Sequence, residues 1–560
     1  MKKLLSVIIA MTLALTALAG VAVAEPQSRE QVTLTMFSMP ANTSGLMENT
    51  WWTNYLNEKL GITLELLPAG DNDDMQIQAL MAADALPDIV IFEGDTYLVN
   101  AIKARMLVCL DDYADNMPNA QKYVKPAMEY YAKNVSDDGK CYSISNNIGP
   151  KTDSSKLNFT ASLRWDLYKQ LGMPEIKDVW DYLDVLKAMQ DLYPTNEDGQ
   201  KVYAITGWSD WDGYNMANAQ QVSMQRGIDS GDQIGAKLPF MCLDYSTGEL
   251  SGSLVEGSAY IDGLKWYFTA NQMGILDPDS MTQNWNTALE KAAAGRLLFN
   301  WWDWAVSGYN TPANVNADSP KGFKTVLPSE SKVPLFTESI VGSGWSWTIS
   351  AKSAHIDRCI EYLDFMCNPD EVFVMANGPQ GETWDLDENG APFLTETGYN
   401  ALTDGTMVLS EGGKLVDGLS ILNSTPISTG TLSEKYGTVI ASSEWDSYVA
   451  PVSKLDADWT AITGYARAVD QVLAGNNYTT VPLAVNLVGA LPDEMQMIAT
   501  QIGDVVKTQS WLAVYAKDEA EFNTIVSDMI VSAQELGLDE LMEYNVSAWN
   551  KAVEMAASYQ

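Results

Sequence analysis

Three tryptophans surround a single acid in the stretch LLFNWWDWAVSGYN, residues 297–310, which carries Trp301, Trp302, Asp303 and Trp304. A pyranose ring has an apolar C–H face that can stack on an indole, and a rim of hydroxyls that a carboxylate can hydrogen-bond. If the chain is extended here, consecutive side chains point to opposite faces, so Trp301 and Trp302 cannot share one core. The stretch therefore predicts a sugar-binding cleft. The alternative is a cluster of buried core residues.

Other segments repeat this combination of a large ring with short polar residues or glycines. Their tryptophans are Trp208 and Trp211 in GWSDWDGYN, Trp345 in GSGWSW and Trp384 in GETWD. Exposed aromatic clusters beside polar groups are typical of binding sites. We therefore expect these rings to be stacking residues and Asp303 to bond sugar hydroxyls. The alternative is again burial, because most of the 18 tryptophans of such a chain pack in its core.

A calcium-loop pattern occupies residues 385–396. Asp385, Asp387, Asn389, Gly390 and Glu396 match D-x-[DN]-x-[DN]-G-x5-E, in which oxygen ligands at alternate positions and a distal glutamate wrap a hard cation. The pattern predicts a calcium site formed by the two aspartates, the asparagine and the glutamate. The alternative is a β-hairpin whose turn is Asn389–Gly390. A proline and the lack of clear flanking helices favour the hairpin.

Catalytic patterns are sparse. The single histidine, His355, excludes zinc sites with several histidines and any histidine-bearing triad that does not use this residue. No Walker loop, no G-x-S-x-G and no G-x-G-x-x-G occurs in the sequence. Two carboxylates for glycoside hydrolysis could come from the 73 acidic residues, but no local pattern singles out a pair. A binding protein is therefore favoured over an enzyme, and no catalytic residue or further cofactor is expected.

The charge of the chain excludes several classes of partner. Lys and Arg number 34 against 73 Asp and Glu, which gives a formal net charge of −39. Such a field repels phosphate backbones and anionic lipid surfaces, so we expect binding of neither nucleic acid nor membrane surfaces. Neutral ligands are not affected by this argument.

The N-terminus has the features of a secretory signal peptide. Lys2 and Lys3 precede an apolar run from Leu4 to Ala19, and Ala22-Val23-Ala24 forms a cleavage site. We expect residues 1–24 to be removed and the protein to be exported. No cysteine lies near the cut, so no lipoprotein anchor is predicted, and no later apolar run is long enough to span a bilayer.

Regular alternation of elements indicates an α/β fold. Strand-like and helix-like segments alternate over residues 32–36, 51–60, 62–67, 73–85 and 88–92. This βαβαβ order predicts a parallel sheet covered on both faces. Ligands bind such sheets beyond the carboxyl ends of the strands, and this places Asp95 among the hydroxyl-bonding candidates.

A second unit begins near Ser162. It carries a predicted helix over residues 285–294, ended by Gly295, and a predicted strand over residues 297–299. The tryptophans of residues 301–304 then follow the end of a strand, where loops carry function.

Several segments together resemble the extracellular solute-binding proteins of ABC importers, family 1, in particular the oligosaccharide-binding subgroup that includes alginate-oligosaccharide binders. They include ALMAADALPDIVIF, KAAAGRLLFNWW, NGPQGETWDLDENGAPFLTETG and GLDELMEYNVSAWNKA, and they are spread over most of the chain. The resemblance implies a two-lobed, periplasmic-binding-protein-like (type II) fold with hinge strands and an interlobe cleft. Lobe 1 would hold residues 30–145 and 326–372. Lobe 2 would hold residues 146–325 and 373–560, including the C-terminal helices.

The resemblance also implies a function. The ligand would close the two lobes, and the closed form, a monomer, would be recognised by ABC permease subunits in the membrane. Arg164 would contact the ligand if the sugar were acidic. Some alginate-binding relatives hold calcium in an acidic loop that corresponds to YPTNEDGQKVY, which offers few suitable acids here. We therefore expect an oligosaccharide-binding protein, with a secreted carbohydrate-active enzyme and a peptide-binding protein as the alternatives.

Overall fold

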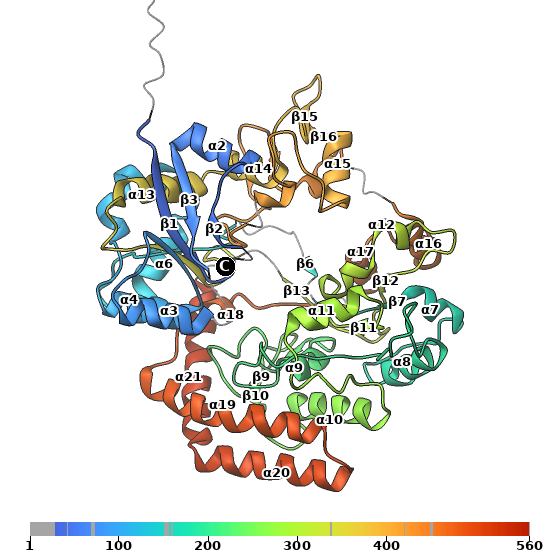
Figure 1. Ribbon diagram of the computed structural model, residues 1–560. Coiled ribbons are helices and arrows are strands. Elements are labelled where there is room, and N and C mark those ends of the chain that lie inside the picture. The colour runs from blue at the N-terminus through green and yellow to red at the C-terminus, as the bar shows by residue number, and fades with distance from the viewer. Residues whose placement is uncertain are drawn as a thin grey trace, which may run out of the picture.

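The computed structural model describes residues 29–41, 43–68, 73–149, 156–157, 159, 161–336, 339–418, 421–448 and 452–558. The predicted signal peptide, residues 1–24, lies outside the described residues. The described chain forms two α/β lobes joined by a small sheet, so the predicted fold class is confirmed (Figure 1).

Three parallel strands form the centre of the first lobe, as the alternating pattern predicted. The six-stranded sheet has the order β2-β3-β1-β4-β14-β5. Its strands are β1 (Val32–Ser38), β2 (Gly45–Leu46), β3 (Ile62–Leu66), β4 (Ile89–Glu93), β5 (Ile144–Ser145) and β14 (Trp345–Ile349). Strand β1 pairs in parallel with β3 and β4, whereas β14 runs antiparallel to β4 and places Trp345 opposite Glu93. Because β1, β3 and β4 are parallel, their carboxyl ends meet at one edge of the sheet.

Helices cover this sheet on both sides. They are α2 (Trp51–Leu60), α3 (Asp73–Ala82), α4 (Asp95–Lys103), η1 (Leu110–Asn116), α5 (Pro118–Tyr123), α6 (Lys125–Asn134), α13 (Ile356–Met366) and α14 (Pro369–Asn377). Helix α2 begins where the Thr50 side chain accepts a hydrogen bond from the Thr53 N–H, and it ends at Gly61, whose φ of 66° suits glycine. Helix α4 starts one residue after β4 and therefore carries Asp95 at the carboxyl edge of the sheet.

The segment after α14 packs on the first lobe. It holds β15 (Trp384–Leu386), β16 (Pro392–Leu394), α15 (Glu396–Thr403), η3 (Leu415–Asp417), β17 (Leu432–Ser433), β18 (Thr438–Val439) and η4 (Ser442–Glu444). Phe373 of α14 stacks on Trp445 with ring centroids 5.2 Å apart and contacts Trp384 at 5.0 Å. These rings share one core with β1 and β3. The expectation that lobe 2 resumes at residue 373 is therefore wrong, because Phe373, Trp384 and Trp445 are buried in the core of lobe 1.

The strands of a three-stranded sheet lie between the two lobes. Its order is β19-β13-β6, formed by β6 (Lys156–Leu157), β13 (Val333–Phe336) and β19 (Tyr478–Thr480). Figure 1 shows β6 and β13 between the first lobe and the second. These strands come from three distant parts of the sequence, as the crossing strands of a hinge do.

The second lobe is mainly helical with short sheets. Its helices are α7 (Trp165–Gln170), α8 (Asp181–Leu192), α9 (Ala217–Met224), α10 (Ala259–Gln272), α11 (Trp285–Ala293), η2 (Trp304–Tyr309), α12 (Pro312–Val315), α16 (Lys454–Thr463), α17 (Ala468–Gly475) and α18 (Ala484–Leu487). Its strands are β7 (Ser162–Arg164), β8 (Ile228–Asp229), β9 (Met241–Asp244), β10 (Leu250–Gly252), β11 (Phe299–Asn300) and β12 (Phe323–Thr325). The helix predicted at residues 285–294 and the left-handed Gly295, with φ 69°, are confirmed.

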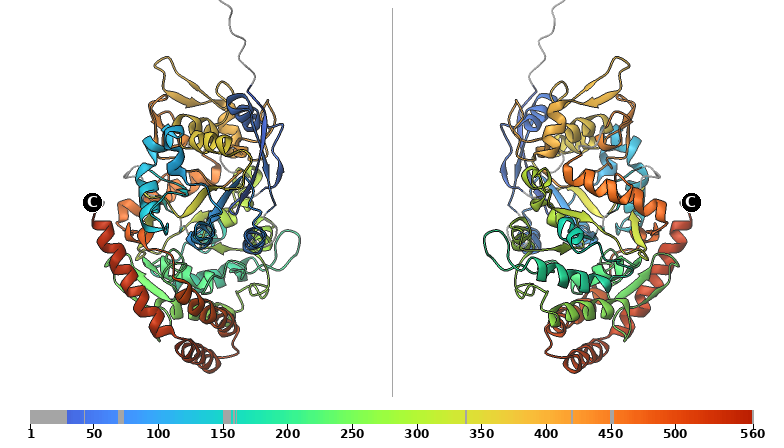
Figure 2. Two further views of the ribbon diagram at one scale, coloured as in Figure 1. Left: turned by 90° about the vertical axis from the view of Figure 1, so that its left-hand side faces the viewer. Right: turned by 90° about the vertical axis from the view of Figure 1, so that its right-hand side faces the viewer.

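Three long helices end the described chain, and they lie together on the second lobe (Figures 1 and 2). They are α19 (Asp493–Val514), α20 (Glu519–Glu535) and α21 (Leu538–Ala557). The Tyr260 and Ser510 hydroxyls share a hydrogen bond of 2.8 Å between α10 and α19, inside a buried interface. The start of α19 also contacts lobe 1, because Asp493 lies 3.4 Å from Lys103 of α4.

Candidate functional site

Five indole rings from three segments meet on the second lobe. We call Trp208, Trp211, Trp285, Trp302 and Trp304 the tryptophan cluster. The ring centroids of Trp211 and Trp304 lie 5.6 Å apart at an interplanar angle of 32°, and Trp302 lies 5.8 Å from Trp304. These spacings are those of contacting aromatic pairs. The two stretches that the sequence singled out independently are therefore adjacent in space.

Exposure differs strongly within the tryptophan cluster. The rings of Trp208 and Trp302 are buried, whereas Trp211 and Trp304 are each 41 % exposed. The buried rings form a base, and the exposed pair presents indole surface to solvent above it. Water-exposed indoles on a rigid aromatic base are suited to stacking on an apolar ring face.

Hydrogen bonds fix the loop that carries Trp211. The Asp212 carboxylate accepts bonds from the Ala217 N–H at 2.8 Å and from the Trp511 Nε1–H at 2.6 Å. The loop is thereby tied to α9 and to the C-terminal helix α19. Burial raises the pKa of Asp212 to about 7, although the two hydrogen bonds oppose this shift.

The other exposed ring begins a short helix. Trp304 is the first residue of η2, and the exposed Asp303 accepts a hydrogen bond from its N–H at 2.8 Å. Trp285 begins α11 and contacts both exposed rings. The sequence predicted it only as the start of a helix. No local sequence signal distinguishes it, because its neighbours come from other segments.

Three of the predicted stacking residues, Trp208, Trp301 and Trp302, are buried in the core of the second lobe. Trp301 points away from the tryptophan cluster and packs on Trp266 at 5.1 Å, and its Nε1–H donates to the Tyr267 hydroxyl at 2.9 Å. The expectation that Trp301 and Trp302 cannot share one core is wrong, because the strand ends at Asn300 and both rings are buried in the same core. Trp301 therefore cannot stack on a ligand. Trp208 is fully buried as well and serves as the base of the cluster.

Three further predicted residues lie elsewhere. Trp384 is wrong as a stacking residue, because it is buried in the first core and its Nε1–H donates to the Gly378 carbonyl. Arg164 is wrong as a ligand contact. It is only 2 % exposed, pairs with Asp166 at 2.8 Å, and its guanidinium lies 4.4 Å above the Tyr309 ring. Trp345 is half-buried at the start of β14.

The calcium pattern adopts the alternative structure. Strands β15 and β16 form a hairpin, and the Asp387 carboxylate accepts bonds from the N–H groups of Asn389 and Ala391, both at 2.8 Å. Asp387 therefore serves the turn, and Asp385 lies on β15 before it. Glu396 begins α15 with an exposed side chain. Among the described residues no three His, Cys, Asp or Glu side chains gather as metal ligands, so these residues do not fit the predicted calcium site.

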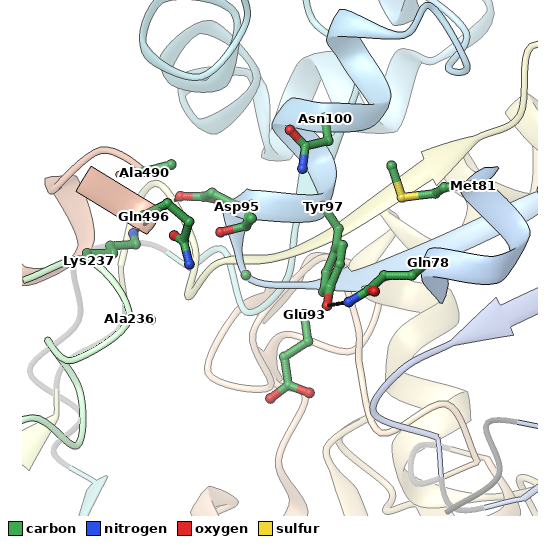
Figure 3. A pocket seen from close by; sticks show the side chains of 12 residues that line it. Gln78, Met81, Glu93, Asp95, Tyr97, Asn100, Ala236, Lys237, Ala490 and Gln496 are labelled. Atoms are coloured by element: carbon green, nitrogen blue, oxygen red, sulfur yellow. Dashed lines mark hydrogen bonds and ion pairs between the residues drawn. The ribbon is translucent and has the colours of Figure 1, made fainter. Parts of the chain in front are cut away.

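Asp95 lines a pocket at the junction of the two lobes. The cavity of about 510 Å³ is bordered by α3, the start of α4, the loop before Leu238 and the region around the start of α19. In Figure 3, Lys237 and Gln496 reach toward Asp95 from one side, and Tyr97 and Gln78 lie on the other. Lys237 and Gln496 were not predicted from the sequence, because no local sequence pattern distinguishes them. The pocket's volume is typical of small-molecule sites.

No described helix is long and apolar enough to cross a bilayer.

Solved structures of the same fold are numerous. FusA, an ABC-transporter substrate-binding protein from S. pneumoniae solved in complex with kestose, matches at a TM-score of 0.61 and 17 % identity, over 94 % of this chain and 100 % of that one. The alginate-binding protein AlgQ2, solved without calcium ion, matches at a TM-score of 0.63 and 15 % identity, over 93 % and 98 % of the two chains. An HMO-binding, ABC-transporter-associated protein from Bifidobacterium longum infantis matches at 0.55 and 16 %, over 93 % and 98 %.

Sequence comparison identifies the family. No curated protein matches the chain. A family model described as bacterial extracellular solute-binding protein matches residues 51–379, which is more than half of the chain. The protein therefore belongs to the bacterial extracellular solute-binding proteins.

Proposed function

We propose that the protein captures an oligosaccharide between its two lobes and delivers it to an ABC importer. The observation that carries the proposal is the exposed pair Trp211 and Trp304 on its buried aromatic base. Several structural neighbours support it, since they are a kestose complex, an alginate-binding protein and an HMO-binding protein.

The chemistry of the cluster suits a sugar more than a peptide. Two indole rings side by side offer apolar area for the C–H faces of successive sugar rings, and the exposed Asp303 can accept bonds from hydroxyls. A peptide site relies instead on backbone hydrogen-bonding edges and on partners for the terminal charges.

The lobes and the sheet between them supply the mechanism of transport. A ligand that contacts both lobes stabilises the arrangement in which they approach each other, because it binds that arrangement more tightly than the open one. Permease subunits in the membrane would then recognise the closed form. Export by the signal peptide and action as a monomer belong to the same proposal.

A ligand screen tests this function. The purified chain is heated with neutral oligosaccharides, acidic oligosaccharides and short peptides in parallel, and the melting temperature is recorded. A ligand that binds the folded state raises this temperature by mass action. We expect an increase with oligosaccharides only. An increase with peptides alone would refute the proposal, and shortened products after incubation with oligosaccharides would indicate an enzyme instead.

A further inference from the structure

Helix α19 lies outside the part of the chain that the family model matches. That model covers residues 51–379, whereas α19 spans Asp493–Val514 and packs on the second lobe (Figures 1 and 2). Trp511 lies in the last turn of α19 and Tyr515 follows it directly, so the two side chains are four residues apart and share one face. Their rings are stacked, with centroids 6.5 Å apart and an interplanar angle of 20°. This face contacts the loop of residues 206–212, which carries Trp208 and Trp211.

Trp511 holds this loop at the residue next to Trp211. Its side chain is only 3 % exposed, and its Nε1–H donates to the Asp212 carboxylate at 2.6 Å. A hydrogen bond to a carboxylate is stronger than one between two neutral groups. A Cβ atom at Gly207 would lie 3.2 Å from the Trp511 ring and 2.8 Å from Asn218 Oδ1, so the absence of a side chain there lets the loop approach α19.

Tyr515 holds the other end of the loop through Asp277. The Tyr515 hydroxyl donates to the Asp277 carbonyl at 3.0 Å, and the Asp277 carboxylate accepts a bond from the Thr206 hydroxyl at 3.1 Å. Gln283 completes the network, because its amide donates to the Gly207 carbonyl at 2.7 Å. Both ends of the loop are therefore bonded, directly or through Asp277, to one face of α19.

The position of the exposed Trp211 ring depends on these anchors. The ring is 41 % exposed, so the backbone that carries it and the rings beneath it set its place. Without the Trp511 donor, the Asp212 Oδ2 atom would lose its hydrogen bond inside a buried site, which is costly. Rotation of Asp212 toward water relieves this cost, but it moves the adjacent Trp211.

We propose that Trp511 and Tyr515 are positioning residues of the oligosaccharide site, which hold Trp211 beside Trp304 for stacking on sugar rings. This inference rests on the proposed function and adds α19 to the elements that determine affinity. The C-terminal helices then serve ligand binding as well as the stability of the second lobe.

Isothermal titration calorimetry of the full chain tests the positioning role. The probes are kestose, maltotriose, mannotriose, xylotriose and trimannuronate, and the probe that binds the wild type most tightly is used for every variant. Trp511→Phe keeps an aromatic ring and removes the N–H donor. Tyr515→Phe removes only a hydroxyl, so it tests the same face of α19 if Trp511→Phe proves unfolded. Melting curves establish which variants are folded.

The matched control is Trp549→Phe in α21. The Trp549 side chain is 4 % exposed, and its Nε1–H donates to the Gly248 carbonyl at 3.2 Å. The control therefore makes the same substitution and removes the same kind of donor from a neighbouring helix, without touching the bond to Asp212.

We expect Trp511→Phe to raise the Kd about five- to tenfold, because Asp212 loses a charge-assisted hydrogen bond and the loop shifts. Tyr515→Phe should raise the Kd about three- to fivefold, since it removes a bond between neutral groups. Trp549→Phe should lower the melting temperature and leave the Kd within about twofold.

A double variant separates positioning from a purely structural role. In a chain that carries Trp211→Ala, the ring that Trp511 positions is gone, so Trp511→Phe should change the Kd by less than about twofold. A structural effect of Trp511 on the whole lobe would persist in this background.

Three results would overturn the positioning role and leave the proposed function intact. The first is a Kd close to that of the wild type in both Trp511→Phe and Tyr515→Phe. The second is an equal loss of affinity in Trp549→Phe, and the third is an undiminished effect of Trp511→Phe in the Trp211→Ala chain. Binding of none of the probes to the wild type would instead refute the proposed function, and this inference with it.

Discussion

Replacement of Trp304 by alanine removes one of the two exposed rings of the proposed stacking surface. A tryptophan side chain can bury up to about 250 Å². The ring of Trp304 is 41 % exposed, so about 100 Å² is available to a ligand. At about 25 cal/mol per Å², full coverage is worth about 2.5 kcal/mol and half coverage about 1.2 kcal/mol. Trp304→Ala should therefore raise the Kd of the bound oligosaccharide by about 8- to 70-fold.

Calorimetric or fluorescence titration with the tightest oligosaccharide from the ligand screen measures this change. The matched control is Trp180→Ala, which removes a half-buried indole of the same lobe outside the tryptophan cluster and should leave the Kd within twofold. Trp304→Phe should lie between wild type and alanine, because a smaller ring covers less of the sugar. An unchanged Kd in Trp304→Ala, in a variant whose melting curve shows a folded protein, would refute the stacking argument.

Three further predictions concern stability. Burial raises the folded-state pKa of Asp212 to about 7, so the native protein holds this proton more tightly than the unfolded protein, and the associated stability is lost as the pH rises from about 4 to about 7. The melting temperature of Asp212→Asn, measured relative to wild type, should therefore rise between pH 5 and pH 8. A difference that stays constant with pH would contradict the raised pKa. Lys291 lies 2.7 Å from the fully buried Asp277, so Lys291→Met should lower the free energy of unfolding by about 3–5 kcal/mol in urea melts, and Asp277→Asn in the same chain should restore part of it. Because the Asp387 carboxylate accepts the hydrogen bonds of a hairpin turn, EDTA and added calcium should leave the melting temperature within about 1 °C. A calcium-dependent increase would contradict this prediction.

The alternating pattern of the N-terminal region was sufficient to predict its sheet. Strands β1 and β3 alternate apolar and polar residues, β4 is a short apolar run, and their parallel pairing follows from the helical connections between them. The helix that begins at Trp285 and the turn at Gly295 were predictable for a similar reason, since capping preferences and left-handed backbone depend on neighbouring residues. The hairpin at Asn389–Gly390 was also visible as an alternative in the sequence.

The candidate site was only partly predictable. The sequence singled out Trp211 and Trp304, and both rings are exposed, because rings beside short polar residues in loops tend to be exposed. That they bind a ligand stays a prediction. The same rule failed for four other rings, which adjacent segments cover: Trp208, Trp301, Trp302 and Trp384. Arg164 failed because a nearby carboxylate and two tyrosine rings bury its charge.

The sequence by itself determined the fold class and the family, because periodicity, turn residues and composition act over short distances along the chain. Only the tertiary structure decided which indoles are exposed, that Phe373, Trp384 and Trp445 pack in the core of lobe 1, and that Lys237 faces Asp95 across the two lobes. These outcomes depend on contacts between segments far apart in the sequence, and local patterns carry no information about which segments meet.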